Sequence, residues 1–204
     1  MSVNSKNVFI GAPDQATTGA ILTGPETDVI PETIDDFVLT GLVDSGYVNE
    51  DGVTITPSET TETIRDWALN VIRRILTEFD GTLAWTHMEL SVAALKTYMG
   101  DDNVDVTAAT ADHGTQVRAA IAGTVRPVKA WYFKLKDGER RALVFVPHGQ
   151  VTERGEIPLT ASAAVTLPVT LSTYPDAAGK SIYIYTDDGV VDAYDGGYAA
   201  YVLA

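Results

Sequence analysis

The sequence predicts a mainly β fold with one short α-helix and an extended arm at each end. From residue 104 onward, short β-prone runs alternate with turn residues, which is typical of an antiparallel β domain. One stretch, residues 91–99, combines a capping residue with an apolar stripe of helical spacing. Both ends of the chain are rich in Gly and Asp. We therefore expect an N-terminal arm at residues 1–37, a β-rich domain at 38–186 and a C-terminal arm at 187–204.

The N-terminal arm is expected to cross a surface rather than to contribute to the core. It contains many Gly, Pro, Thr and Asp residues, and only residues 8–10 and 20–22 look like short strands. The next β-prone segments, 42–48 and 53–55, flank Asn49-Glu50-Asp51-Gly52, which has the composition of a hairpin turn.

A polar flap is expected at residues 49–63. Residues 56–63 contain no apolar side chain, so we expect an exposed loop rather than a packed element. Residues 64–79 are ambiguous. Their apolar residues follow the i, i+3, i+4, i+7 spacing of an amphipathic helix. However, Asp80-Gly81 ahead of the β-prone residues 82–86 favours a tight hairpin between two strands.

The helix at residues 91–99 and the strands after it are better defined. Ser91 can cap the helix, and Gly100 can adopt the left-handed conformation that ends one. The clearest hairpin joins residues 129–135 to 140–146 through Lys136-Asp137-Gly138-Glu139. Three more strands are expected at residues 150–156, 163–174 and 181–186.

Composition excludes several classes of protein. The chain has 204 residues, 28 acidic and 14 basic side chains, a net charge of −14 and no cysteine. The lack of cysteine removes disulfides, thiolate metal sites and cysteine nucleophiles. The acid surplus, which lies in residues 1–64 and 155–204, argues against sequence-independent binding to nucleic acid. No apolar run has the length of a membrane span or a secretory signal.

The motifs predict no catalytic residue, cofactor or metal site, and hence no enzyme. The three histidines, His87, His113 and His148, lack ligand spacing and are expected to be isolated surface or rim residues. The run Asp101-x-Asn103-x-Asp105 resembles the start of a calcium loop, but it lacks the Gly and Glu that such a loop requires. The tryptophans, Trp67, Trp85 and Trp131, could line a sugar groove, although core packing is the commoner role in strands.

One region carries a more specific signal. Residues 46–53 read Gly-Tyr-Val-Asn-Glu-Asp-Gly-Val, and the rest of the polar flap and Ile64-Arg65-Asp66-Trp67 follow. Residues 90–100, ending in Gly100, and Pro147-His148-Gly149-Gln150-Val151-Thr152-Glu153 come next. In this order the segments resemble the major tail (tail tube) proteins of long, non-contractile-tailed bacteriophages, over about residues 38–174.

The resemblance implies a β-sandwich or barrel-like tail tube fold in which residues 64–79 are strand. It implies hexameric rings stacked into a tube in the virion, assembled in the host cytoplasm, through which DNA passes as non-adhering cargo. Implied partners are other copies of the chain and the tape-measure, tail terminator and distal tail proteins, with no membrane or cofactor. We expect the flap and the N-terminal arm to carry ring-to-ring contacts. The candidate residues are Glu50, Asp51, Gly52, Thr56, Pro57, Ser58, Glu59, Thr60, Thr61 and Glu62.

Two other functions stay open at this stage. A decoration or tail-completion protein would bind a preformed phage surface without polymerising alone. A carbohydrate-binding or carbohydrate-hydrolysing β-sandwich would bind glycans without assembling.

Overall fold

The computed structural model of the protein describes residues 8–15 and 19–190. Its strands are β1 (Ile21–Pro25), β2 (Val43–Asp44), β3 (Thr54–Arg65), β4 (Val71–His87), β5 (Val104–Thr107), β6 (Gln116–Ala119), β7 (Lys129–Asp137), β8 (Arg140–Arg154), β9 (Leu167–Thr173) and β10 (Tyr183–Asp187). The helices are α1 (Val92–Met99) and two 3₁₀ turns, η2 (Ile34–Asp36) and η3 (Asp101–Asn103). The prediction of a mainly β fold with one short α-helix is confirmed.

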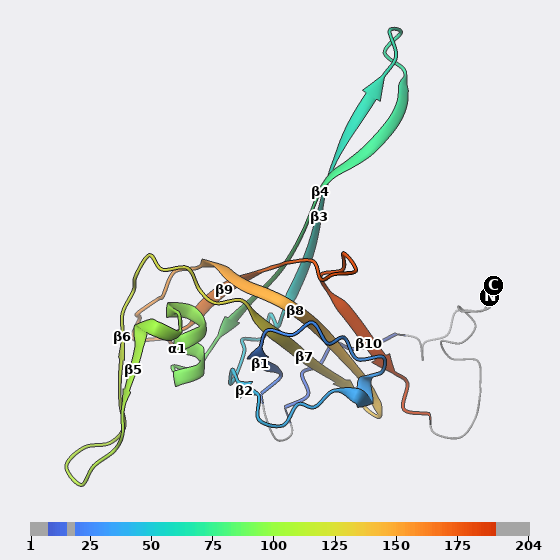
Figure 1. The fold of residues 1–204 in the computed structure, drawn as a ribbon. Coiled ribbons are helices and arrows are strands. Elements are labelled where there is room, and N and C mark those ends of the chain that lie inside the picture. The colour runs from blue at the N-terminus through green and yellow to red at the C-terminus, as the bar shows by residue number, and fades with distance from the viewer. Residues whose placement is uncertain (1–7, 16–18, 191–204) are drawn as a thin grey trace.

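The body is an eight-stranded antiparallel sheet (Figure 1). Seven strands follow the order β2-β1-β7-β8-β9-β4-β3, and β10 pairs with β8 outside this order. The long strand β8 joins the parts, because its first half pairs with β10 and its second half with β9. Strands β5 and β6 form a separate pair beside α1.

Apolar side chains are buried on both faces of this sheet, because successive residues of a strand point to opposite sides. One cluster includes Trp85, Trp131 and Leu171 and extends to Ala94 and Tyr98 of α1. The other cluster lies under the segment that contains η2. Its buried members are Leu22, Ala130, Tyr132, Leu143 and Phe145, with Phe37 packed against them.

The caps of α1 agree with the sequence. The Ser91 hydroxyl oxygen accepts a hydrogen bond from the Ala94 N–H at 3.2 Å. Gly100 follows the helix with a φ of 99° and donates its N–H to the Lys96 carbonyl. The Tyr98 hydroxyl donates to the Gly155 carbonyl at 2.5 Å, which fastens the helix to the end of β8. None of the helices in the described ranges is long and apolar enough to cross a membrane.

The prediction of an N-terminal arm outside the core is wrong for residues 20–25. Strand β1 lies inside the sheet between β2 and β7, and the Ile21 side chain has no solvent exposure. Ahead of it, residues 8–15 run beside β7, where the Asp14 N–H donates to the Lys134 carbonyl at 3.1 Å. Residues 1–7, 16–18 and 191–204, which include most of the predicted C-terminal arm, lie outside the described residues.

Two local predictions also need correction. The turn at residues 49–52 forms, with a Gly52-to-Asn49 hydrogen bond of 3.0 Å and a Gly52 φ of 66°. Its flanking segments do not pair with each other, because β2 pairs with β1 and β3 pairs with β4. Residues 140–146 and 150–156, expected as separate strands, belong largely to the single strand β8.

Candidate assembly surface: the outer hairpin

The β3–β4 hairpin extends well beyond the body of the sheet (Figure 1). Residues 82–84 of β4 pair with both β3 and β9, and residues 85–87 pair with β9. From Gly81 outward, β4 pairs only with β3. We call residues 57–81 the outer hairpin. At a rise of about 3.4 Å per residue, its strands project roughly 35 Å.

The root of the outer hairpin is fixed to the body at Gly81. The Thr173 hydroxyl of β9 donates to the Gly81 carbonyl at 3.0 Å. A Cβ atom at Gly81 would stand 2.7 Å from that hydroxyl oxygen, so glycine permits the close approach. The hairpin is therefore anchored where it leaves the sheet.

The tip is a defined turn at residues 66–70. The Asp66 carboxylate accepts the Asn70 backbone N–H at 2.7 Å, and the Arg65 guanidinium donates to the Leu69 carbonyl at 2.8 Å. Hydrogen bonds from the Asn70 side chain and backbone lower the pKa of Asp66, so the carboxylate stays ionised and holds the turn. Leu69 has a φ of 67°, the one positive value among the described non-glycine residues.

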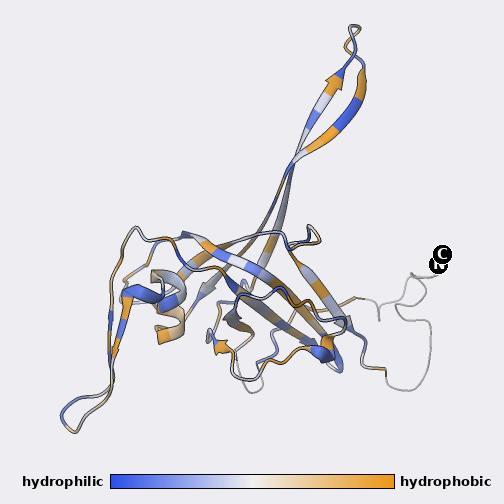
Figure 2. Cartoon of the chain, in the orientation of Figure 1, coloured by the Kyte–Doolittle hydropathy of each residue, from blue (hydrophilic) through white to orange (hydrophobic). Residues whose placement is uncertain are grey.

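The outer hairpin carries large apolar side chains that are exposed in the described chain. Trp67 at the tip is fully exposed, Leu69 is 72% exposed and Phe79 is 49% exposed. Apolar and polar residues alternate along the hairpin in Figure 2. The other exposed apolar residues are Ile64, Val71, Ile72, Ile75 and Leu76. An exposed apolar surface of this kind makes the outer hairpin a candidate interaction site.

Two β-bulges interrupt the period of two that apolar residues show in a regular strand. The register of β3 against β4 shifts between Thr60 and Thr61 and between Ile64 and Arg65, and Thr77 and Ile72 have no partner in β3. Each bulge adds a residue to β4, so side chains on one face are no longer two apart. Phe79, Leu76 and Val71 consequently lie on one face, opposite the odd-numbered residues Glu59, Thr61 and Arg65 of β3. The strand interpretation is correct for residues 64–65 and 71–79, which flank the turn at 66–70. The tight hairpin expected at Asp80-Gly81 is wrong, because both residues lie within the continuous strand β4.

The outer hairpin is also divided by charge. Arg65, Arg73 and Arg74 lie near the tip, while Glu59 and Glu62 lie lower on β3. No ion pair with an acid of the described chain involves these three arginines. Residues 65–74 thus combine exposed apolar side chains with three arginines and one acid, Asp66.

The sequence-predicted site residues occupy two neighbouring places. Residues 57–62 lie on β3 in the outer hairpin, with Thr56 at its root. The prediction of a loop here is wrong, because the whole segment is strand, although it is exposed as expected. Glu50, Asp51 and Gly52 lie in the turn just before β3. The sequence analysis did not name the tip or the apolar residues of β4 as site residues. The mixture of apolar and basic residues after Trp67 could have indicated them.

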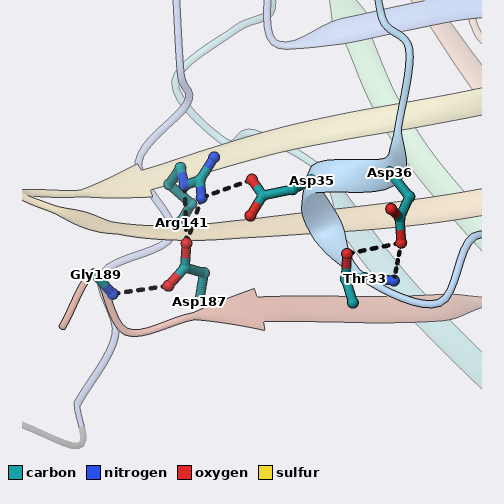
Figure 3. A network of polar contacts seen from close by, with 6 residues as sticks. All are labelled: Thr33, Asp35, Asp36, Arg141, Asp187 and Gly189. Carbon is teal, nitrogen blue, oxygen red and sulfur yellow. Dashed lines mark hydrogen bonds and ion pairs between the residues drawn. The ribbon is translucent and has the colours of Figure 1, made fainter. Parts of the chain in front are cut away.

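A polar cluster holds the N-terminal segment against the body (Figure 3). The Arg141 guanidinium of β8 donates to Asp35 of η2 at 3.0 Å and to Asp187 at the end of β10. The backbone N–H of Gly189 and the Arg141 side chain lower the pKa of Asp187. The segment around η2 and the end of β10 are therefore fixed through one arginine.

The histidines and the calcium-like run have structural roles. The prediction of surface histidines is wrong for His87, which is fully buried, and for His148, which is 8% exposed. The His148 ring contacts the carboxylates of Glu26 at 2.8 Å and Asp28 at 3.3 Å. Asp101 pairs with Lys129 at 2.8 Å. The described residues contain no group of three or more acids and histidines placed to hold a metal.

The tryptophans divide between core and tip. Trp85 and Trp131 are buried, with ring centroids 5.3 Å apart, as core packing predicts. Trp67 is the exception, because it lies in the exposed turn of the outer hairpin.

Comparison with known proteins identifies the family. A search of curated proteins finds no match. Among solved structures, the chain is similar to one described as the cryo-EM structure of the anti-feeding prophage cap, the tube terminating cap. That similarity has a TM-score of 0.44 at 11% identity, and covers 92% of this chain and all of the other. The family model described as "Phage tail tube protein" matches residues 1–195. The chain therefore belongs to the phage tail tube protein family.

Proposed function

We propose that this structural tail protein assembles with copies of itself into stacked hexameric rings that form the tube of a long, non-contractile tail. The tube is the conduit for DNA ejection. Family membership supports a structural role in the virion. The observation that carries the self-assembly proposal is the outer hairpin, which projects from the body with apolar side chains that are exposed in the described chain.

The energetics of the outer hairpin support a role in assembly. A two-stranded ribbon is marginally stable by itself in water, and exposed Trp, Leu, Ile and Phe side chains make it costly to leave unpartnered. Burying several of these side chains against another subunit supplies a favourable apolar contact. Ring-to-ring contact by the hairpin explains its length, its anchored root and its composition together.

The charge of the chain is compatible with the passage of DNA. A net charge of −14 per subunit gives a ring a large negative charge, which repels phosphates. DNA is then cargo that does not adhere to the wall. The remaining proposed partners are the tape-measure protein, the tail terminator and the distal tail protein, and assembly takes place in the host cytoplasm.

Excision of the outer hairpin tests the self-assembly proposal. Ser58 and Asp80 are paired across the hairpin, so residues 59–79 can be replaced by a two-residue Asn-Gly turn. Removal of β3 alone would instead leave β4 without its partner. The matched control shortens the β5–β6 loop at residues 110–113, which are distant from the hairpin (Figure 1).

Negative-stain microscopy of the purified chains gives the readout. We expect tubes or stacked rings from the wild type and the loop-shortened control, and folded subunits without stacks from the hairpin excision. Normal tubes from the excised chain would show that the hairpin does not carry ring stacking. Discrete monomers of the wild type at every concentration would favour a decoration or tail-completion protein.

A further inference from the structure

A cavity of about 410 Å³ opens beside the root of the outer hairpin. It lies between the turn at residues 49–53, the N-terminal segment at 11–15 and the sheet. Leu83 and Phe133 are buried at its base. Its more accessible apolar lining comes from Val48, Val53, Ile55 and Leu135. A hollow of this size and lining can accept a large apolar side chain.

The rim of the cavity is mainly acidic. Glu50 and Asp51 lie in its lining, and Lys134 is also present. Asp51 accepts a hydrogen bond from the Asn49 amide at 2.6 Å, and Glu50 is exposed to solvent. The carboxylates of the turn are thus available to a positively charged partner.

The tip of the outer hairpin has the complementary properties. Trp67 and Leu69 supply exposed apolar side chains, and Arg73 and Arg74 lie in the first part of β4 after the turn. Tryptophan is among the residues that contribute most to protein interfaces when a pocket receives it. Opposite charges around such a contact favour the correct partner and orientation.

The tip cannot enter the cavity of its own chain. Ile55 at the cavity and Arg65 beside the tip are ten residues apart along β3, or roughly 35 Å in an extended strand. We propose that the tip of one copy, with Trp67 as its anchor, inserts into the acid-rimmed cavity of a second copy. This inference rests on the proposed function and names the surface on which the hairpin docks. A contact between two different patches is head-to-tail, so its repetition gives a closed ring or an open array according to whether the rotation closes.

Thiol crosslinking tests this contact directly, because the chain has no cysteine of its own. Ala68→Cys places one thiol at the tip, and Gln15→Cys places another at the cavity lining. The two single variants are mixed and treated with a short bifunctional thiol reagent. Ala68→Cys mixed with Asp112→Cys, on the β5–β6 loop, is the matched control. We expect a crosslinked heterodimer from the first mixture and none from the control.

Substitution of the anchor gives a second readout. Trp67→Ala in the tip chain is expected to raise the concentration needed for crosslinking and for tube formation about 30-fold or more. Arg74→Glu is expected to weaken crosslinking, and Glu50→Arg in the partner copy to restore it. A contact that does not involve the acidic rim would show no such restoration.

The outcomes separate this inference from the proposed function. Tubes without a crosslink between the Ala68→Cys and Gln15→Cys chains would overturn the docking site and leave self-assembly in place. Crosslinked pairs without tubes would support the docking site and contradict the tube. Neither tubes nor crosslinks would overturn both. Equal crosslinking of the Trp67 and Trp67→Ala chains would show that Trp67 is not the anchor of the contact.

Discussion

Acidification from pH 7 to pH 5 is expected to destabilise the folded subunit through His87. The imidazole is buried, and its Nε2 accepts a hydrogen bond from the Trp85 indole N–H at 2.9 Å. That acceptor must be unprotonated. Burial lowers the pKa of His87 from 6.5 to about 4, and the Ser45 backbone offsets only part of this effect.

The size of the effect follows from proton linkage. The unfolded chain takes up a proton near pH 6.5, whereas folded His87 takes one up only near pH 4. Stability is therefore greatest above pH 6.5 and falls as the pH decreases through this window. Each pKa unit corresponds to about 1.36 kcal/mol, so the free energy of unfolding decreases by about 2 kcal/mol between pH 6.5 and pH 5.

Urea unfolding at several pH values, with and without His87→Gln, measures this quantity. A glutamine oxygen can accept the Trp85 N–H but does not titrate, so the variant should lose about 2 kcal/mol less than the wild type between pH 7 and pH 5. Equal losses in the two proteins would refute the assignment of this pH dependence to His87. The comparison also removes the contribution of His113 and His148, which both proteins share.

Three further outcomes are expected. Trp131→Ala should lower the free energy of unfolding by about 3–5 kcal/mol in urea titrations, because it empties a buried site. Gly149→Ala should cost about 1–3 kcal/mol in the same assay, since its Cβ would lie 2.7 Å from the Trp131 ring and 3.0 Å from Leu171. Amide hydrogens of residues 58–65 and 71–80 should exchange quickly in free subunits and slowly in tubes, as measured by mass spectrometry.

Short sequence patterns correctly predicted the helix ends and the turns that are determined by residues close together in the chain. Ser91 and Gly100 mark the ends of α1, and Lys136-Asp137-Gly138-Glu139 forms the β7–β8 turn, with a Gly138 φ of 64°. These features follow from backbone geometry and from hydrogen bonds within a few residues. The mainly β fold class was likewise predicted from short β-prone runs that alternate with turn residues.

Local sequence patterns do not indicate which strands distant in sequence pair with each other. The run at residues 20–22 is short and lies among Gly, Pro and Thr, yet it is buried because β7 and β2 bracket it in the sheet. The apolar surroundings of His87 likewise depend on strands distant in sequence, because its neighbour Trp85 packs against Trp131. No local pattern near residue 87 indicates that burial.

The candidate site was located only in part, for a physical reason. Residues 56–63 were recognised as exposed because they lack apolar side chains, but their pairing with β4 supplies the strand. The apolar residues of β4 depart from the period of two of a regular strand, because two bulges each add a residue to that strand. A periodicity test assumes an uninterrupted strand, so it fails where the strand is bulged.

The distribution of residues within the outer hairpin fits the proposed role of its tip and faces in assembly. Strand β3 is one edge of the sheet, and its Glu59, Glu62 and Pro57 discourage edge-to-edge pairing with another strand. The apolar side chains lie instead on the faces of β4 and at the tip, where Trp67 is fully exposed. Glu59, Glu62 and Pro57 oppose indiscriminate aggregation through the β3 edge. The subunit can still bury its apolar tip and faces when a partner subunit presents a matching cavity.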